Sequence, residues 1–303
     1  MINKELYQRI LEKLNKLDAL RPINKAALQK LQETFRVEMT YNSNAIEGNT
    51  LSLSETKLVL EEGLTIGGKT LNEHLEATNH SKAMELLQTL VEKKEVCEND
   101  VLNIHAIILD RIDPQNAGFY RRGSVRISGT TYTPPNAVKV PQLMQEFYKL
   151  LNSRGNTIEV AAEVHQKFVD IHPFIDGNGR TARLLMNLYL MRNRYPPVII
   201  LKNERRQYIE SITKWQMHNQ AQNFVNFIAK AVERSLNMYL DTLGDENNEY
   251  ISLSEAATIS KNNYSSEYLS LLARKGKIGA VKFGRNWKIT KKELEEYERK
   301  TRD

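Results

Sequence analysis

The residues best suited to chemistry form one unbroken run, from His172 to Arg183, with the sequence HPFIDGNGRTAR. Gly177, Asn178 and Gly179 permit a tight turn whose backbone N–H groups can face an anion. A helix that starts at this turn would add the positive end of its dipole. The run therefore predicts a phosphate-binding turn.

Charged side chains in the same run suit the rest of a phosphoryl-transfer site. Arg180 and Arg183 are three residues apart, so on a helix they share one face and can bind oxygens of one polyphosphate. Asp176 offers the hard oxygen ligands that Mg²⁺ prefers beside phosphates. His172 has a pKa near neutrality, which suits a base that takes a proton from an attacking hydroxyl. Each feature alone is common in structural loops and solvated helix faces, but their conjunction predicts a catalytic site.

The run matches in full the signature HxFx(D/E)GNGRxxR of Fic-domain proteins, and the resemblance extends over roughly residues 41–234. It implies a helical fold and the transfer of AMP from ATP, with Mg²⁺, to a Ser, Thr or Tyr hydroxyl of a target protein, the chain itself included. By this resemblance, His172 deprotonates the target hydroxyl and Asp176 binds Mg²⁺. The residues implied in phosphate binding are Gly177, Asn178, Gly179, Arg180 and Arg183.

Two further segments are expected to complete this site. Adenosine contacts should come from a helix over residues 204–220, where Tyr208 and Gln216 are the candidates. The segment GFYRRGSVRI, residues 118–127, resembles the family's flap, which aligns an extended target segment by strand addition. Glycines and prolines break any helix between Asp110 and Pro141, and residues 125–128 alternate as a short strand does. We therefore expect a β-hairpin flap here, with an ordinary long surface loop as the alternative.

A second family pattern lies upstream, in the sequence SNAIEG. Ser43, Glu47 and Gly48 match the inhibitory pattern (S/T)xxxE(G/N). The resemblance implies that Glu47 pairs with Arg183 and displaces the γ-phosphate, so that ATP binds with its α-phosphate misaligned for in-line attack. The alternative is a Glu-Gly pair that ends a helix with a surface carboxylate. The pattern is compatible with action within one chain and with action between two copies.

Amphipathic periodicity predicts that helices position the site. The apolar residues that recur at three- and four-residue intervals near the N-terminus are Leu6, Ile10, Leu14 and Leu17. Similar patterns predict helices over residues 26–39, 75–91, 142–151, 158–171, 179–194, 204–217 and 224–240. Ser52 and Glu55 have capping-box spacing ahead of a helix that Gly63 would close. His105 and His165 are expected to be packing residues.

The C-terminal segment is more basic than the rest of the chain. Residues 250–303 contain 12 basic and 7 acidic residues, which accounts for +5 of the net charge of +6. The segment resembles the winged helix-turn-helix of excisionase and MerR-type proteins, with the order strand, helix, helix, hairpin, helix. Lys282, Arg285 and Lys288 could contact DNA phosphates. The expected recognition helix, residues 265–274, departs from the usual pattern because it carries Glu267 and no basic residue before Arg274. DNA binding and a role as a protein-interaction or dimer module both remain open.

Together these patterns define the expected architecture. The fold class is mainly α, a Fic-type helical bundle with a short β-hairpin flap and a small C-terminal winged helix-turn-helix domain. The expected domains are an N-terminal helical region with the inhibitory motif (1–95), a Fic catalytic domain (96–243) and the winged helix-turn-helix-like domain (250–303). The single cysteine of the 303 residues excludes an internal disulfide framework, and the lack of a long apolar window excludes a membrane helix. We therefore expect a cytoplasmic protein with no membrane partner.

The expected function is that of a protein adenylyltransferase held in check by Glu47. One alternative is a DNA-binding transcriptional regulator whose Fic body senses nucleotide. Another is a Fic enzyme that uses a different phosphate donor or removes AMP. The expected partners are a hydroxyl-bearing target protein, DNA through the C-terminal domain, and a second copy of the chain in a homodimer.

Overall fold

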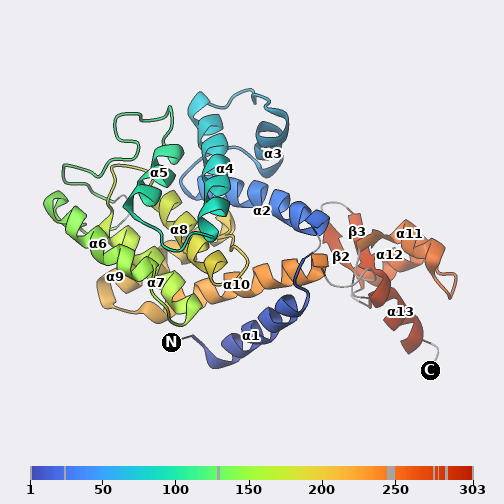
Figure 1. Cartoon of the computed structure of the whole chain (residues 1–303). Coiled ribbons are helices and arrows are strands. Elements are labelled where there is room, and N and C mark those ends of the chain that lie inside the picture. Colours follow the sequence, from blue (N-terminus) through green and yellow to red (C-terminus); the bar gives the residue numbers. More distant parts are fainter. Residues whose placement is uncertain are drawn as a thin grey trace. The chain divides into compact units, whose positions relative to one another are not determined.

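Helices make up most of the chain in the computed structural model, which describes residues 2–23, 25–127, 130–243, 250–275, 277–278, 280–283 and 286–301 (Figure 1). The first ten helices, in chain order, are α1 (Lys4–Ala19), α2 (Lys25–Ile46), α3 (Leu53–Glu62), α4 (Leu71–Val91), α5 (Glu98–Ile108), α6 (Val140–Leu151), α7 (Thr157–Ile171), α8 (Asn178–Arg192), α9 (Arg205–His218) and α10 (Ala221–Leu243). Two 3₁₀ turns, η1 (Ala137–Lys139) and η2 (Lys202–Glu204), precede α6 and α9. The helices predicted from periodicity are confirmed, with boundaries shifted by a few residues.

The chain forms two compact units. The larger unit contains Met1–Asn15 and Leu28–Leu236, and the smaller contains Lys16–Ala27 and Asn237–Asp303. This division does not test the domains expected from the sequence (1–95, 96–243 and 250–303), which stay a prediction.

The core of the larger unit surrounds α8, which contacts α4, α5 and α7. Nearly every residue of α8 is buried, as is typical of a helix packed on all sides. Figure 1 shows α8 among the other helices of this unit. The first turns of this helix carry Arg180 and Arg183, which are only 3% and 5% exposed. Because a buried charge is costly unless it is paired, both guanidinium groups require partners in the interior.

The start and end of α3 follow from its sequence. The Ser52 N–H donates to Glu55 Oε2 (2.7 Å) and the Glu55 N–H donates to Ser52 Oγ (3.2 Å), which completes the predicted capping box. Gly63 ends the helix with a left-handed φ of 66°. Both predictions for this helix are confirmed.

The segment between α5 and η1 differs from the β-hairpin flap that the sequence predicted. Its described residues, 109–127 and 130–136, form turns, bends and irregular chain without a strand. The guanidinium of Arg121 donates to the carbonyl of Gly123 (3.0 Å) on one arm and to that of Pro135 on the other. A side chain thus joins the two arms where a hairpin would use a backbone ladder, and Pro134 and Pro135 have no N–H to donate to one. The prediction of a hairpin is therefore wrong for residues 118–127, while Ser128 and Gly129 lie outside the described residues.

The smaller unit contains β1 (Tyr250–Ser252), α11 (Leu253–Ile259), α12 (Ser266–Arg274), β2 (Val281–Phe283), β3 (Asn286–Thr290) and α13 (Lys291–Lys300). The strands form an antiparallel sheet in the order β1-β3-β2, with Ile251 opposite Ile289 and Lys282 opposite Trp287. Its core is made of Leu253, Ala256, Leu269, Leu272, Ala273, Ile278, Ile289 and Leu294. The predicted order of strand, helix, helix, two strands and helix is confirmed.

The residues expected to contact DNA are only partly described. Arg285 lies outside the described residues, and for Lys282 the backbone alone is described. Hydrogen bonds with Ser252 lower the pKa of Glu255 most, and the charge of Lys288 lowers it further. DNA contact by these residues stays a prediction.

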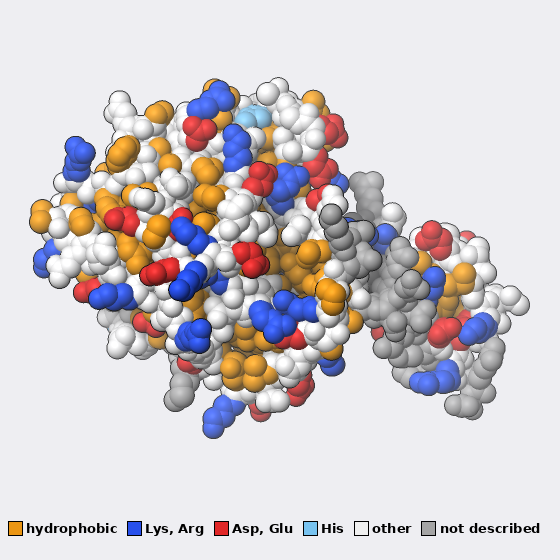
Figure 2. Space-filling view, viewed as in Figure 1, with side chains coloured by type: hydrophobic (Ala, Val, Ile, Leu, Met, Phe, Trp, Pro, Cys, Tyr) orange, Lys and Arg blue, Asp and Glu red, His pale blue; other side chains and the backbone are white. Residues whose placement is uncertain are grey.

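The surface of the larger unit mixes charges of both signs. Lys, Arg, Asp and Glu side chains are interspersed over the face drawn in Figure 2, with apolar side chains between them. Within the described residues, the helices include none that is both long enough and apolar enough to span a bilayer.

Three buried histidines make the folded state sensitive to acid. Burial lowers the pKa of His80 and of His165 to about 3, and that of His105 to about 4, from the ordinary value of about 6.5. Between about pH 6.5 and pH 4 these histidines therefore bind protons in the unfolded chain but stay neutral in the folded chain. The free energy of unfolding consequently decreases as the pH falls. We expect a loss of several kcal/mol between about pH 7 and pH 4.5, measured by urea unfolding. A flat profile over this range would contradict the prediction.

Candidate active site

His172 stands at the end of α7, where Pro173 prevents the helix from continuing. Its backbone is left-handed, with φ 50° and ψ 59°, and its N–H donates to the carbonyl of Phe168 (2.9 Å). This conformation costs a residue other than glycine about 1–2 kcal/mol, so the surrounding structure must stabilise it. The His172 carbonyl accepts a hydrogen bond of 2.7 Å from Nε of Arg121.

The imidazole of His172 is half-buried, and burial lowers its pKa below the usual range. A hydrogen bond with the carbonyl of Val169 (3.4 Å) opposes this effect, the charge of Arg121 adds to it, and the carboxylates of Glu47 and Asp176 oppose it. The net lowering of the pKa keeps the ring neutral at pH 7. A neutral imidazole is the form that can accept a proton from a hydroxyl.

Buried His105, on α5, supports the loop that follows His172. Its Nδ1 accepts a hydrogen bond from the Gly118 N–H (3.0 Å), so Nε2 carries the proton and donates to the Asp176 carbonyl (3.0 Å). The ring stacks on Phe174 with centroids 3.5 Å apart. Gly177 has a φ of 75°, and a Cβ atom there would lie 3.3 Å from the His105 ring. The prediction that His105 is a packing residue is confirmed, and the structure adds that it fixes this loop.

The anion-binding turn lies at the start of α8. Both polar atoms of the Asn178 amide bond the backbone of Phe174, Oδ1 to its N–H and Nδ2 to its carbonyl, each at 3.0 Å. The N–H groups of the first helical turn lack acceptors within the helix, so they are available to an anion. A Cβ atom on Gly179 would collide with Oε1 of Glu47. The Glu47 carboxylate therefore lies directly against the turn.

All three nitrogens of the buried Arg183 guanidinium have partners. Nε donates to Ser43 Oγ (3.0 Å), and Nη2 donates to the Ser43 carbonyl (2.9 Å) and to Glu47 Oε1 (2.8 Å). Nη1 lies 3.4 Å from the Tyr208 hydroxyl. The structure thus brings the motif arginine and the upstream glutamate together, 136 residues apart, within one chain.

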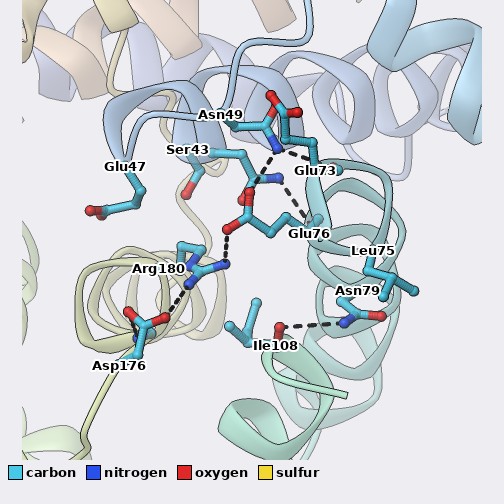
Figure 3. Close-up of polar contacts among 12 residues, drawn as sticks. Ser43, Glu47, Asn49, Glu73, Leu75, Glu76, Asn79, Ile108, Asp176 and Arg180 are labelled. Atoms are coloured by element: carbon cyan, nitrogen blue, oxygen red, sulfur yellow. Dashed lines mark hydrogen bonds and ion pairs between the residues drawn. The ribbon is translucent and has the colours of Figure 1, made fainter. Parts of the chain in front are cut away.

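The turn that carries Glu47 follows α2 directly and is held on α4. Gly48 adopts a φ of 108°, which glycine tolerates best. Asn44 Nδ2 donates to the Glu76 carbonyl (3.1 Å), and Asn49 Nδ2 donates to Glu76 Oε2 (2.8 Å). Figure 3 shows Glu76 between this turn and Arg180.

Arg180 lies between two carboxylates (Figure 3). Its Nη1 donates to Glu76 Oε1 (3.1 Å) and its Nη2 to Asp176 Oδ2 (3.3 Å). Among the described residues its Nε is buried without a hydrogen-bond partner. Glu76 lies upstream of the motif and orients a guanidinium that sequence reasoning assigned to phosphate.

Asp176 is the residue of the site that could hold Mg²⁺. Its side chain is 64% exposed, its Oδ1 accepts the Gly177 N–H (2.6 Å), and its bond to Arg180 is long. The described residues contain no cluster of three metal-binding side chains. Mg²⁺ is commonly held by one or two carboxylates together with substrate phosphates, so a single exposed carboxylate beside an anion-binding turn fits this ion.

The two candidates for adenosine contact have other partners in the structure. Tyr208 is 2% exposed, and its hydroxyl lies 2.7 Å from Nε2 of the buried His165. Gln216 donates from Nε2 to Asp170 Oδ1 (2.9 Å). Tyr208 therefore lies behind Arg183 in the core, and Gln216 lies beside the end of α7. Their contact with a nucleotide stays a prediction.

Sequence reasoning missed three residues that position the site: Glu76, His105 as a loop support, and Arg121. Glu76 and Arg121 lie outside the motif, and most of the bonds of His105 and Arg121 go to backbone atoms. No side-chain pattern signals a bond to a carbonyl. Of the three, only His105 had a signal in the sequence: it stands in the apolar run IHAIIL, which indicates burial.

Comparison with known proteins agrees with this geometry. Residues 95–190 match the model of the Fic/DOC family. A structure of Fic-1, residues 134–508, from C. elegans is 33% identical, with a TM-score of 0.70, and the match covers 77% of this chain and 71% of that one. The chain belongs to the Fic family.

Other relatives extend the Fic likeness. A Fic domain containing signaling protein from Bacteroides thetaiotaomicron VPI-5482 is 27% identical with a TM-score of 0.73, over 80% of this chain and 98% of that one. A curated relative, the protein adenylyltransferase Fic of Drosophila ananassae, is 39% identical over 250 residues, which are 80% of this chain. The Fic chain spans about half the length of that relative (50%).

Proposed function

We propose that this Fic chain is a protein adenylyltransferase, which moves AMP from ATP to a Ser, Thr or Tyr hydroxyl of a protein. His172 takes the proton of the hydroxyl, and the hydroxyl oxygen attacks the α-phosphorus. The bond between that phosphorus and the oxygen bridging to the β-phosphate breaks, so pyrophosphate leaves, and His172 returns its proton to solvent. The products are an AMP-modified side chain and pyrophosphate.

The observation that carries this proposal is the arrangement of Asp176, Arg180 and Arg183 at the start of α8, together with His172, whose pKa responds to the carboxylates of Asp176 and Glu47. Buried guanidinium groups and free N–H groups at one helix start suit a polyphosphate. Asp176 would hold Mg²⁺, and the bound ion would supply charge neutralisation between phosphates. Curated relatives carry the name protein adenylyltransferase, which supports the same reaction.

We further propose that Glu47 inhibits this reaction. Both N–H groups of Nη2 of Arg183 are already bonded, one to the Ser43 carbonyl and one to Glu47, so a γ-phosphate can bind Nη2 only by displacing the Glu47 carboxylate. With Glu47 in place, the triphosphate would bind in a shifted position, and its α-phosphorus would be poorly aligned for the attacking oxygen.

For the smaller unit we propose a winged helix-turn-helix module. The element order and the sheet order β1-β3-β2 support this assignment, with β2 and β3 as the wing. Exposed Tyr268 and Leu271 on α12, in place of basic residues, make a protein-binding role as compatible with the module as DNA binding.

Labelled nucleotides test the proposed reaction. Purified Glu47→Gly protein should incorporate label from ATP labelled at the α-phosphate and none from ATP labelled at the γ-phosphate, because only the AMP portion is transferred. Intact mass should increase by one AMP per modified side chain. Label from the γ-phosphate, or from neither position in the presence of magnesium, would overturn the proposal.

A further inference from the structure

The flap segment and the catalytic histidine share one anchor, Arg121. This arginine lies in the segment between α5 and η1, and its side chain is 3% exposed. A charge buried to this extent needs several partners. Among the described residues, no carboxylate forms an ion pair with it, and its side chain donates to backbone carbonyls.

Three successive carbonyls at the end of α7 accept hydrogen bonds from Arg121. Its Nη2 donates to Ile171 (3.4 Å), its Nε to His172 (2.7 Å) and its backbone N–H to Pro173 (2.9 Å). A helix C-terminus carries partial negative charge, which a guanidinium complements. Arg121 thus binds the peptide groups on both sides of the left-handed His172.

The same guanidinium holds both arms of the flap segment. Nη1 donates to the Gly123 carbonyl (3.0 Å), and Nη2 donates also to that of Pro135. One guanidinium group therefore holds the segment between α5 and η1 in a fixed position relative to the backbone of His172. A movement of either would break bonds to the other.

We infer that Arg121 is a positioning residue for the transfer reaction, which sets the distance between His172 and a target segment docked on the flap. This inference rests on the proposed function. Arg121 has no partner among Asn178, Arg180 and Arg183, so its role is separate from that of the nucleotide-binding residues. Its loss should affect the attack by the target hydroxyl and spare ATP binding.

Two substitutions in the Glu47→Gly background test the inference. Arg121→Gln removes the charge and most of the donors, and Arg121→Lys keeps the charge but cannot reach four carbonyls with one ammonium group. We expect both variants to lose roughly 10- to 100-fold in the rate of auto-AMPylation, because small displacements of reacting groups have effects of this size. The dissociation constant of MgATP, measured by calorimetry, should change less than about twofold. Arg154→Gln, an exposed arginine in the loop between α6 and α7, is the matched control.

The pH profile separates positioning from a general loss of structure. Arg121, Glu47 and Asp176 are the charged groups that act on His172, and the charge of Arg121 lowers the histidine pKa. Arg121→Gln should therefore shift the acid limb of the rate profile to higher pH, whereas Arg121→Lys should leave the limb in place at a reduced rate. Circular dichroism identifies a variant that fails to fold. If Arg121→Gln does not fold, the rate and pH profile of Arg121→Lys test the inference.

An unchanged rate in a folded Arg121 variant would overturn the inference, and so would an equal loss of rate and ATP affinity. Failure of the proposed function is distinguishable, because the Glu47→Gly parent with intact Arg121 would then transfer no AMP.

Discussion

Replacing Glu47 by Gly should raise the rate of auto-AMPylation by about 100-fold, because it frees Arg183 for the γ-phosphate and lets the α-phosphorus align with the attacking oxygen. The wild-type contact is an ion pair of 2.8 Å between Glu47 Oε1 and Arg183 Nη2, in which the arginine is buried and the glutamate 38% exposed. Because the carboxylate lies against Gly179, its removal also clears the anion-binding turn. The measurement is the initial rate of label incorporation from α-labelled ATP.

Two variants control this experiment. Glu47→Gln keeps the shape of the side chain but not its charge, so it should be activated less than Glu47→Gly. Glu62→Gly changes an exposed glutamate at the end of α3 and should leave the rate at the wild-type level. A Glu47→Gly protein as slow as the wild type would refute inhibition by this contact.

Replacing His172 by Ala in the active Glu47→Gly background should lower the transfer rate by roughly 10²- to 10⁴-fold, the usual contribution of a general base. ATP binding should persist within about twofold, since the bonds that hold Arg180, Arg183 and Asn178 do not involve the imidazole. Single-turnover label transfer and calorimetry measure the two quantities. Parallel loss of binding and rate, or a rate that survives the substitution, would exclude His172 as the base.

The pH dependence of the parent enzyme provides a second readout for His172. Burial lowers the pKa of this histidine, so the transfer rate should stay constant through neutral pH and fall only below the ordinary histidine range of about 6.5. The acid limb should be absent in the residual activity of His172→Ala.

The contiguous part of the site was predictable because its chemistry is local. His172, Asp176, the glycines and the two arginines follow one another around a single turn, so their spacing alone places them together. Capping at Ser52 and Gly63 is equally local and is confirmed. The pairing of Glu47 with Arg183 came from a family pattern and not from spacing, because the two residues are far apart in the chain.

The remaining contacts depend on tertiary packing. Glu76 follows the capped start of α4, and nothing in its neighbourhood distinguishes it from other surface glutamates, yet packing places it on Arg180. Alternating residues 125–128 favoured a strand, but the described part of that run, residues 125–127, is not a strand, and Arg121 joins the carbonyls of Gly123 and Pro135 on either side of it. The ring of Tyr208 is buried in the core, which its place on a helix did not indicate, and its contact with a nucleotide stays a prediction. In each case a long-range partner outweighed the local preference.

Two arginines at the start of α8 pair with three carboxylates: Arg180 with Glu76 and Asp176, and Arg183 with Glu47. This group of five side chains therefore carries one net formal negative charge. A free triphosphate approaching without a counter-cation meets like-charge repulsion before it reaches the helix start. We therefore expect occupancy by ATP to rise steeply with divalent cation concentration and with ionic strength at low salt. If Glu47 inhibits as proposed, the resting chain should bind the cation-bound nucleotide in preference to free ATP, independently of how well adenine fits.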